Sequence, residues 1–216
     1  MLRDSSTPVR CARKKLSAVL LAGGESRRMG MDKATCLFRG RPLWQVQLET
    51  LRRLRPAEIF VSARTDPSWR PTDVQFIPDI QPSCGPLSGI AASLGKIRTA
   101  HLLVLAIDMP FMTENYLRSI CDAIESGCGV VVKIDDRSEP LAAAYPREAE
   151  IEFRTALAGS DFSLQNIVRH LLTAGTLQEK SVTEQDRGLF RNLNKVSDVE
   201  AGNERLKNVG TNSSCT

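Results

Sequence analysis

The chain has 216 residues, 42% hydrophobic and 25% charged, a composition that is typical of a globular protein and excludes collagenous, fibrous and wholly disordered chains. The net charge of +4, with a pI near 8.8, favours an anionic ligand but is too small and too dispersed for duplex nucleic acid, so no nucleic-acid partner is expected. The six cysteines form no Cys-x-x-Cys pair and the two histidines lie far apart, which argues against a zinc cluster or a disulfide framework and indicates reduced thiols.

The N-terminal 15 residues are polar and basic without periodicity, and they predict a mobile leader. The apolar run Leu16–Ala22 then predicts a parallel strand buried on both faces. The two together could imitate a secretory signal, but the run has only the minimum length for a signal core, and cleavage would separate it from the glycines that follow. No apolar stretch is long enough to span a membrane, so we expect a cytoplasmic protein with no membrane partner.

Apolar runs and helical periodicity alternate along the rest of the chain. The predicted strands cover 58–63, 74–78, 101–107, 129–134 and 140–145. The predicted helices cover 42–54, 86–97, 113–127, 147–157 and 163–172. This order predicts an α/β fold with a mostly parallel, doubly wound sheet, whose ligands bind beyond the carboxyl ends of the strands. We expect one domain over 16–207, with 1–15 and 208–216 as flexible tails.

The loop after the first strand has the composition of a polyphosphate site. Gly23 and Gly24 let backbone amides approach an anion closely. Arg27, Arg28 and Lys33 add charged donors. The spacing differs from a P-loop, in which lysine directly follows the last glycine, and from the dinucleotide fingerprint. The alternative is a solvated basic loop, which the paired glycines after a buried strand make the weaker interpretation.

Further along the chain, Asp108 ends an apolar run, where a carboxylate is costly unless it is paired or binds a cation such as Mg²⁺. The alternative for Asp108 is a helix cap or a turn before Pro110. Asp79 follows a predicted strand and Pro78, and aspartate beside a proline is common in plain turns. The segment Gly85–Ile90 has small residues that would let a ligand lie close to the backbone, and the alternative is a tight helix entry.

Several segments in a fixed order resemble the signature of the molybdenum cofactor guanylyltransferases, the molybdopterin-guanine dinucleotide biosynthesis protein A family of the nucleotidyltransferase superfamily. The first segment is shared with many nucleotidyltransferases, whereas the ordered series is far more specific. The resemblance implies a three-layer, Rossmann-like nucleotide-diphospho-sugar transferase fold. The matching segments are Leu21–Gly24 with Ser26, Arg28–Gly30 and Asp32–Lys33, then Gly40–Leu43, Val61–Ala63, Asp79, Gly85–Ile90, Asp108–Pro110, Glu139–Leu141 and Phe190–Asn194.

The resemblance also implies the reaction. An enzyme of this kind binds GTP with Mg²⁺, joins GMP to the terminal phosphate of molybdopterin or molybdenum-molybdopterin, and releases pyrophosphate. Transient contact with molybdenum-insertion proteins or apo-molybdoenzymes would follow. The implied catalytic residues are Arg28, Lys33 and Asp108, with Asp108 holding the metal. The implied nucleotide contacts are Leu21, Ala22, Gly23, Gly24, Lys33, Asp79, Gly85, Pro86, Leu87 and Asp108, while Asn192 and Asn194 lie near the acceptor or on a closing strand.

Two positions bear on the choice of nucleotide. Gly23 stands where the similar cytidylyltransferases tend to have alanine, and the missing methyl favours a purine. Arg64 stands where the guanylyltransferases commonly have a nucleotide-contacting asparagine, and a guanidinium cannot accept hydrogen bonds. A cytidylyltransferase or sugar-phosphate nucleotidyltransferase of the same fold, and a non-catalytic nucleotide- or pterin-binding accessory protein, therefore remain alternatives.

Overall fold

The computed structural model describes residues 16–23 and 32–193. Its centre is a seven-stranded sheet in the order β5-β4-β1-β6-β8-β7-β9. Only β8 runs antiparallel to its neighbours, so the sheet is mostly parallel, as predicted. The strands are β1 (Ser17–Leu21), β4 (Glu58–Ala63), β5 (Gln75–Pro78), β6 (His101–Ala106), β7 (Gly129–Ile134), β8 (Arg137–Pro146) and β9 (Leu177–Ser181).

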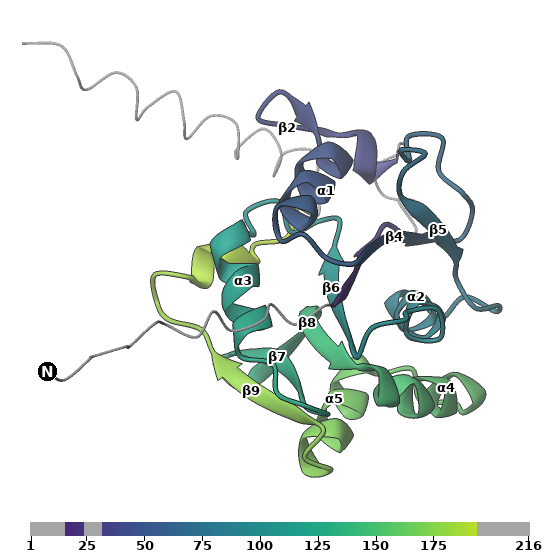
Figure 1. The fold of residues 1–216 in the computed structure, drawn as a ribbon, viewed down its shortest axis with the longest axis vertical. Coiled ribbons are helices and arrows are strands. Elements are labelled where there is room, and N and C mark those ends of the chain that lie inside the picture. Colours follow the sequence, from purple (N-terminus) through teal and green to yellow (C-terminus); the bar gives the residue numbers. More distant parts are fainter. Residues whose placement is uncertain (1–15, 24–31, 194–216) are drawn as a thin grey trace, which may run out of the picture.

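Helices cover both faces of this sheet (Figure 1). One face carries α1 (Leu43–Arg53) and α3 (Glu114–Asp122), and the other carries α2 (Pro86–Leu94), α4 (Glu150–Ala158) and α5 (Leu164–Thr173). Successive residues of β1 enter different cores because strand side chains alternate: Leu20 packs with α1, and Leu21 packs with α2. The predicted three-layer α/β fold is confirmed.

Local signals explain most of the helix boundaries. The Thr113 side chain accepts a hydrogen bond from the Tyr116 amide and begins α3, as the sequence predicts. The helix ends at Asp122, however, because the chain then enters a tight turn closed by the pairing of Glu125 with Cys128. Likewise, the helix predicted over 147–157 begins as the 3-10 turn η3 (Arg147–Ala149) before α4.

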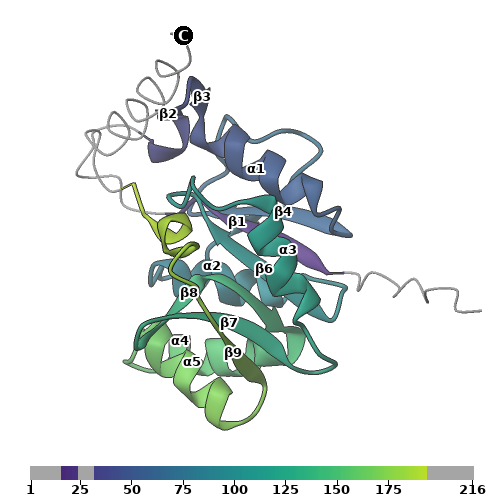
Figure 2. The same cartoon turned by 90° about the vertical axis from the view of Figure 1, so that its left-hand side faces the viewer.

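The strand predicted over 140–145 lies within β8, but the sequence pattern predicts neither the direction of β8 nor the edge strand β9 nor a small hairpin. Strand β8 is antiparallel because a two-residue turn joins it to β7, and a parallel crossover needs a dozen residues or more. Edge strand β9 buries only Leu177, so it lacks an apolar run. A small hairpin of β2 (Leu37–Phe38) and β3 (Arg41–Pro42) precedes α1, and Figure 2 shows it at the opposite end of the molecule from α4 and α5.

The predicted tails at 1–15 and 208–216 lie outside the described residues, so these predictions and the domain boundaries stay predictions. Within the described ranges, no helix is long and apolar enough to cross a bilayer.

Candidate active site

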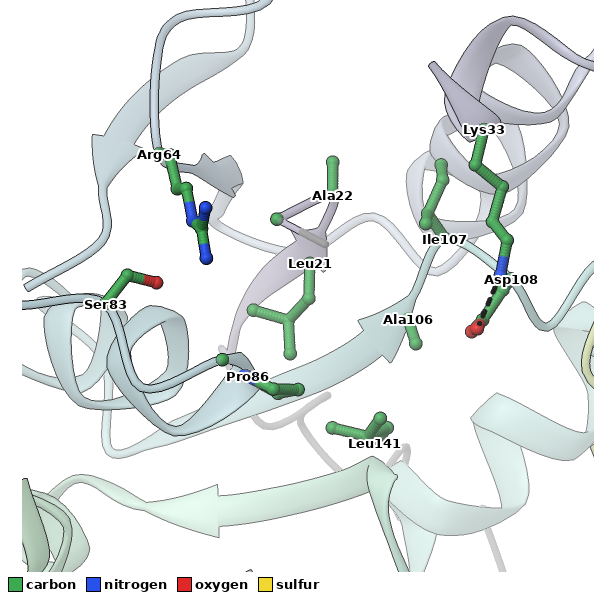
Figure 3. A pocket seen from close by; sticks show the side chains of 12 residues that line it. Leu21, Ala22, Lys33, Arg64, Ser83, Pro86, Ala106, Ile107, Asp108 and Leu141 are labelled. Carbon is green, nitrogen blue, oxygen red and sulfur yellow. Dashed lines mark hydrogen bonds and ion pairs between the residues drawn. The ribbon is translucent and has the colours of Figure 1, made fainter. Parts of the chain in front are cut away.

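A cavity of about 440 Å³ lies where β1, β4 and β6 end. Because these strands are parallel, their carboxyl ends reach the same edge of the sheet, and the loops that follow them converge there. Figure 3 shows Arg64 and Ser83 on one side of the end of β1, and Lys33 with Asp108 on the other. The lining residues are Leu21, Ala22, Gly23, Lys33, Arg64, Ser83, Gly85, Pro86, Ala106, Ile107, Asp108 and Leu141.

Lys33 and Asp108 form an ion pair at one end of the cavity (Figure 3). The Lys33 Nζ donates to the Asp108 Oδ2 at 3.2 Å, and the two side chains are 20% and 23% exposed. Lys33 begins the 3-10 turn η2 (Lys33–Thr35), which Asp32 caps by accepting from the Ala34 amide. The backbone carbonyl of Asp108 accepts from the Leu193 amide at 2.9 Å, which ties the C-terminal segment to this end. A lysine ammonium beside a carboxylate can hold and neutralise a phosphate.

Asp79 lies behind the wall of the cavity, 6% exposed, and accepts hydrogen bonds from the Ser62 hydroxyl at 3.1 Å and the Ser83 hydroxyl at 3.3 Å. Burial raises the pKa of this carboxyl, while the two hydroxyls and the charge of Arg64 act in the opposite direction. A Cβ atom at Gly23 would lie 2.9 Å from the Asp79 Oδ2. The Asp79 carboxylate therefore explains the glycine at this position, and a purine is not needed to explain it.

The N-terminus of α2 forms another part of the wall. Gly85 has a φ of +69°, a left-handed conformation that favours glycine, and its carbonyl accepts from the Ser88 amide at 3.1 Å. Pro86 occupies the first helical turn, where its missing N–H costs nothing. The positive end of the helix dipole thus faces the cavity and suits an anion. The Leu87 side chain is fully buried in the core, so only its backbone could reach a ligand.

Glu139 on β8 is a candidate functional residue to which the sequence interpretation gave no role. Its Oε1 accepts from the Leu141 amide at 3.1 Å, and burial raises its pKa, with the charge of Asp108 adding to the effect. Glu139 and Leu141 also line a second hollow of about 520 Å³, together with Arg137 and Ser138. The only sequence feature that points to Glu139 is that the segment Glu139–Leu141 belongs to the family resemblance.

The structure thus brings most of the predicted site residues to one cavity. Asp79 lies behind the wall of that cavity, and the side chain of Leu87 lies in the core. Arg28, Gly24 and Asn194 lie outside the described residues, and Asn192 is exposed beside Leu193. The roles of all these residues stay predictions. The predicted residues that line the cavity are Leu21, Ala22, Gly23, Lys33, Gly85, Pro86 and Asp108.

Solved structures resemble this fold over most of the chain. Molybdopterin-guanine dinucleotide biosynthesis protein A from Archaeoglobus fulgidus superposes with a TM-score of 0.72 at 24% identity, covering 89% of this chain and 99% of the other. 4-Diphosphocytidyl-2C-methyl-D-erythritol synthase from Anaerococcus prevotii superposes with a TM-score of 0.68 at 15% identity, covering 90% and 96%. At these identities the likeness shows the fold alone.

The sequence comparisons are more specific. A relative from Opitutus terrae, named "Probable molybdenum cofactor guanylyltransferase", is 33% identical over 197 residues, which cover 90% of this chain and 96% of the relative. Residues 18–175 match the family described as the MobA-like NTP transferase domain, and this range contains both Lys33 and Asp108. The chain therefore belongs to the MobA-like NTP transferase family.

Proposed function

We propose that this protein transfers GMP from GTP to the terminal phosphate of molybdopterin or molybdenum-molybdopterin and releases pyrophosphate. The observation that carries the proposal is the convergence of Lys33, Asp108 and the N-terminus of α2 on the cavity where β1 ends. The names of similar proteins that cover nearly the whole chain support the choice of substrates. We expect no nucleic-acid or membrane partner.

The reaction needs alignment and charge neutralisation more than covalent help from the protein. An oxygen of the acceptor phosphate attacks the α-phosphorus of GTP, a new P–O bond forms, and the bond from that phosphorus to the leaving pyrophosphate oxygen breaks. Lys33 would donate to the phosphates and stabilise the negative charge that develops on the leaving group. Arg28 is predicted to assist it. Both cations act by position and charge, and neither has to transfer a proton.

The donor set around Asp108 fits Mg²⁺. This ion keeps several waters and takes one or two protein carboxylates together with substrate phosphates, and it does not need an all-protein cage. The described residues contain no group of three or more candidate metal ligands, so phosphate oxygens and waters would complete the coordination of an ion held at Asp108. Asp108 would hold the ion. When bound, Mg²⁺ would neutralise phosphate charge and polarise the phosphorus being attacked.

The acceptor would approach over Leu141. This residue lines both the nucleotide cavity and the neighbouring hollow beside Glu139, so a molecule in that hollow can reach the end of the cavity where Asp108 lies. We place the reaction in the cytoplasm, consistent with the free thiols of the described cysteines. Molybdenum-insertion proteins or apo-molybdoenzymes would then receive the product.

A cytidylyl transfer is the second candidate, and Arg64 favours it. Its guanidinium lines the cavity and can only donate hydrogen bonds, so it cannot accept from the amino and imino groups of guanine. The test incubates the protein with Mg²⁺, molybdopterin and GTP, CTP, ATP or UTP in turn, and measures pyrophosphate release and the dinucleotide product. Fastest turnover with GTP is expected. Fastest turnover with CTP would replace the guanylyl assignment, and binding without turnover would indicate an accessory protein.

A further inference from the structure

The indole of Trp69 contacts the turn that carries Lys33. Its Nε1 donates to the Asp32 Oδ2 at 2.8 Å, across 37 residues of sequence. The other carboxylate oxygen, Oδ1, accepts from the Ala34 amide at 3.0 Å, and the Asp32 carbonyl accepts from the Thr35 amide at 3.0 Å. Asp32 therefore uses one oxygen to close the turn and the other to attach it to Trp69.

Trp69 is itself held in place by its surroundings. Its ring stacks on Trp44 of α1, with ring centroids 5.7 Å apart and an angle of 17° between the planes. The next residue, Arg70, pairs with Asp66 through two hydrogen bonds of 2.7 Å and also donates to the carbonyl of Val74. The braced loop between β4 and β5 thus presents the indole N–H to Asp32, the residue that caps η2.

We infer that Trp69 is a positioning residue for Lys33. Asp32 directly precedes Lys33, so a turn held by the indole fixes where the backbone of Lys33 begins and keeps its ammonium within reach of Asp108. The same loop starts with Arg64, which lines the opposite side of the cavity. Trp69 therefore connects the turn of Lys33, the lysine proposed to bind the phosphates, to the loop that begins at Arg64 on the other side of the cavity. This role rests on the proposed function, because it assumes that Lys33 binds a triphosphate.

The first experiment is calorimetry of GTP with Mg²⁺ on the full chain. Trp69→Phe keeps an aromatic ring on Trp44 but removes the N–H donor, and Trp44→Phe is the matched control that keeps the donor. We expect Trp69→Phe to weaken GTP binding about tenfold, as for a lost hydrogen bond to a charged group, and Trp44→Phe to change it less than twofold. The melting temperature of Trp69→Phe should stay close to that of the wild type.

The second experiment separates positioning from a structural role by combining Trp69→Phe with Lys33→Met. If Trp69 acts through Lys33, the double variant binds GTP no more weakly than Lys33→Met alone. An equal further loss in the double variant, or wild-type affinity in Trp69→Phe, would overturn the inference. Asn at position 32 has a single side-chain acceptor oxygen and cannot accept from both the Ala34 amide and the Trp69 indole. Asp32→Asn should therefore weaken GTP binding at least as much as Trp69→Phe. A wild-type protein that binds no GTP would instead refute the proposed function.

Discussion

Replacing Gly23 by alanine tests whether the Asp79 carboxylate shapes the wall of the cavity. The new Cβ would lie 2.9 Å from the Asp79 Oδ2 and 3.4 Å from the Ala63 Cα, so it cannot move away from the carboxylate without pressing on β4. The carboxylate cannot yield freely either, because the hydroxyls of Ser62 and Ser83 hold its two oxygens. Overpacking of this kind costs about 1–3 kcal/mol. We expect the free energy of unfolding in urea to fall by that amount and GTP binding to weaken.

Two further variants isolate the cause. Gly85→Ala meets nothing within 4 Å, so its effect comes only from a φ of +69° and should be about 1–2 kcal/mol. Ser83→Ala removes the hydroxyl that holds the Asp79 Oδ2, so this oxygen can move away from the new methyl group. The double variant Gly23→Ala/Ser83→Ala should therefore lose less free energy of unfolding than the two single variants lose together. Strict additivity, or a Gly23→Ala protein with wild-type stability and GTP affinity, would refute the argument from crowding.

Three other substitutions test the charged groups. Lys33→Met should lower kcat for pyrophosphate release about a hundredfold, while the free energy of unfolding changes by less than about 1 kcal/mol because the ion pair is partly exposed. Asp108→Ala should abolish Mg²⁺-dependent turnover in the same assay and keep the wild-type circular dichroism spectrum, and turnover at the wild-type rate would exclude Asp108 as the metal ligand. Burial raises the pKa of Glu139 above 4.5, because the folded protein favours the protonated carboxyl. The contribution of Glu139 to the free energy of unfolding is therefore fully present below pH 4.5 and is lost as the pH rises through the raised pKa. Between pH 4 and pH 7, the free energy of unfolding in urea should therefore fall less for Glu139→Gln than for the wild type. An equal fall in both proteins would contradict the effect of burial on Glu139.

The elements of the fold were predictable where a buried segment has a recognisable apolar pattern in the sequence. Strands β4 and β7 match their predicted ranges, because interior strands of a parallel sheet are apolar on both faces. Strand β9 lies at the sheet edge and reads Leu-Gln-Glu-Lys-Ser, so nothing in its own pattern distinguishes it from a loop. The strand forms because it pairs with β7, and this pairing between segments far apart in the sequence cannot be recognised from the residues of β9 alone.

The candidate site was predictable to a similar extent. Lys33 belongs to a loop that begins with paired glycines after a buried strand, and Asp108 ends an apolar run, so the local sequence marks both residues as unusual. The hydrogen bonds of Asp79, the burial of Glu139 and the contact from Trp69 to Asp32 depend on loops that meet only in the folded chain. The sequence therefore indicates which residues contact a ligand more readily than which residues hold them in place.

The charges around the cavity give a physical reason to expect a metal requirement. Lys33 and Arg64 line it, but Asp108 already offsets Lys33 at 3.2 Å, and the charge of Asp108 also acts on Glu139 of β8. Burial raises the pKa values of both Asp79 and Glu139, so an approaching anion makes their charged forms still less favourable. Among the residues that the structure describes, the cations of the cavity alone do not balance a triphosphate, and a divalent ion on Asp108 would supply the missing positive charge. GTP affinity should accordingly fall more steeply than GMP affinity when Mg²⁺ is removed.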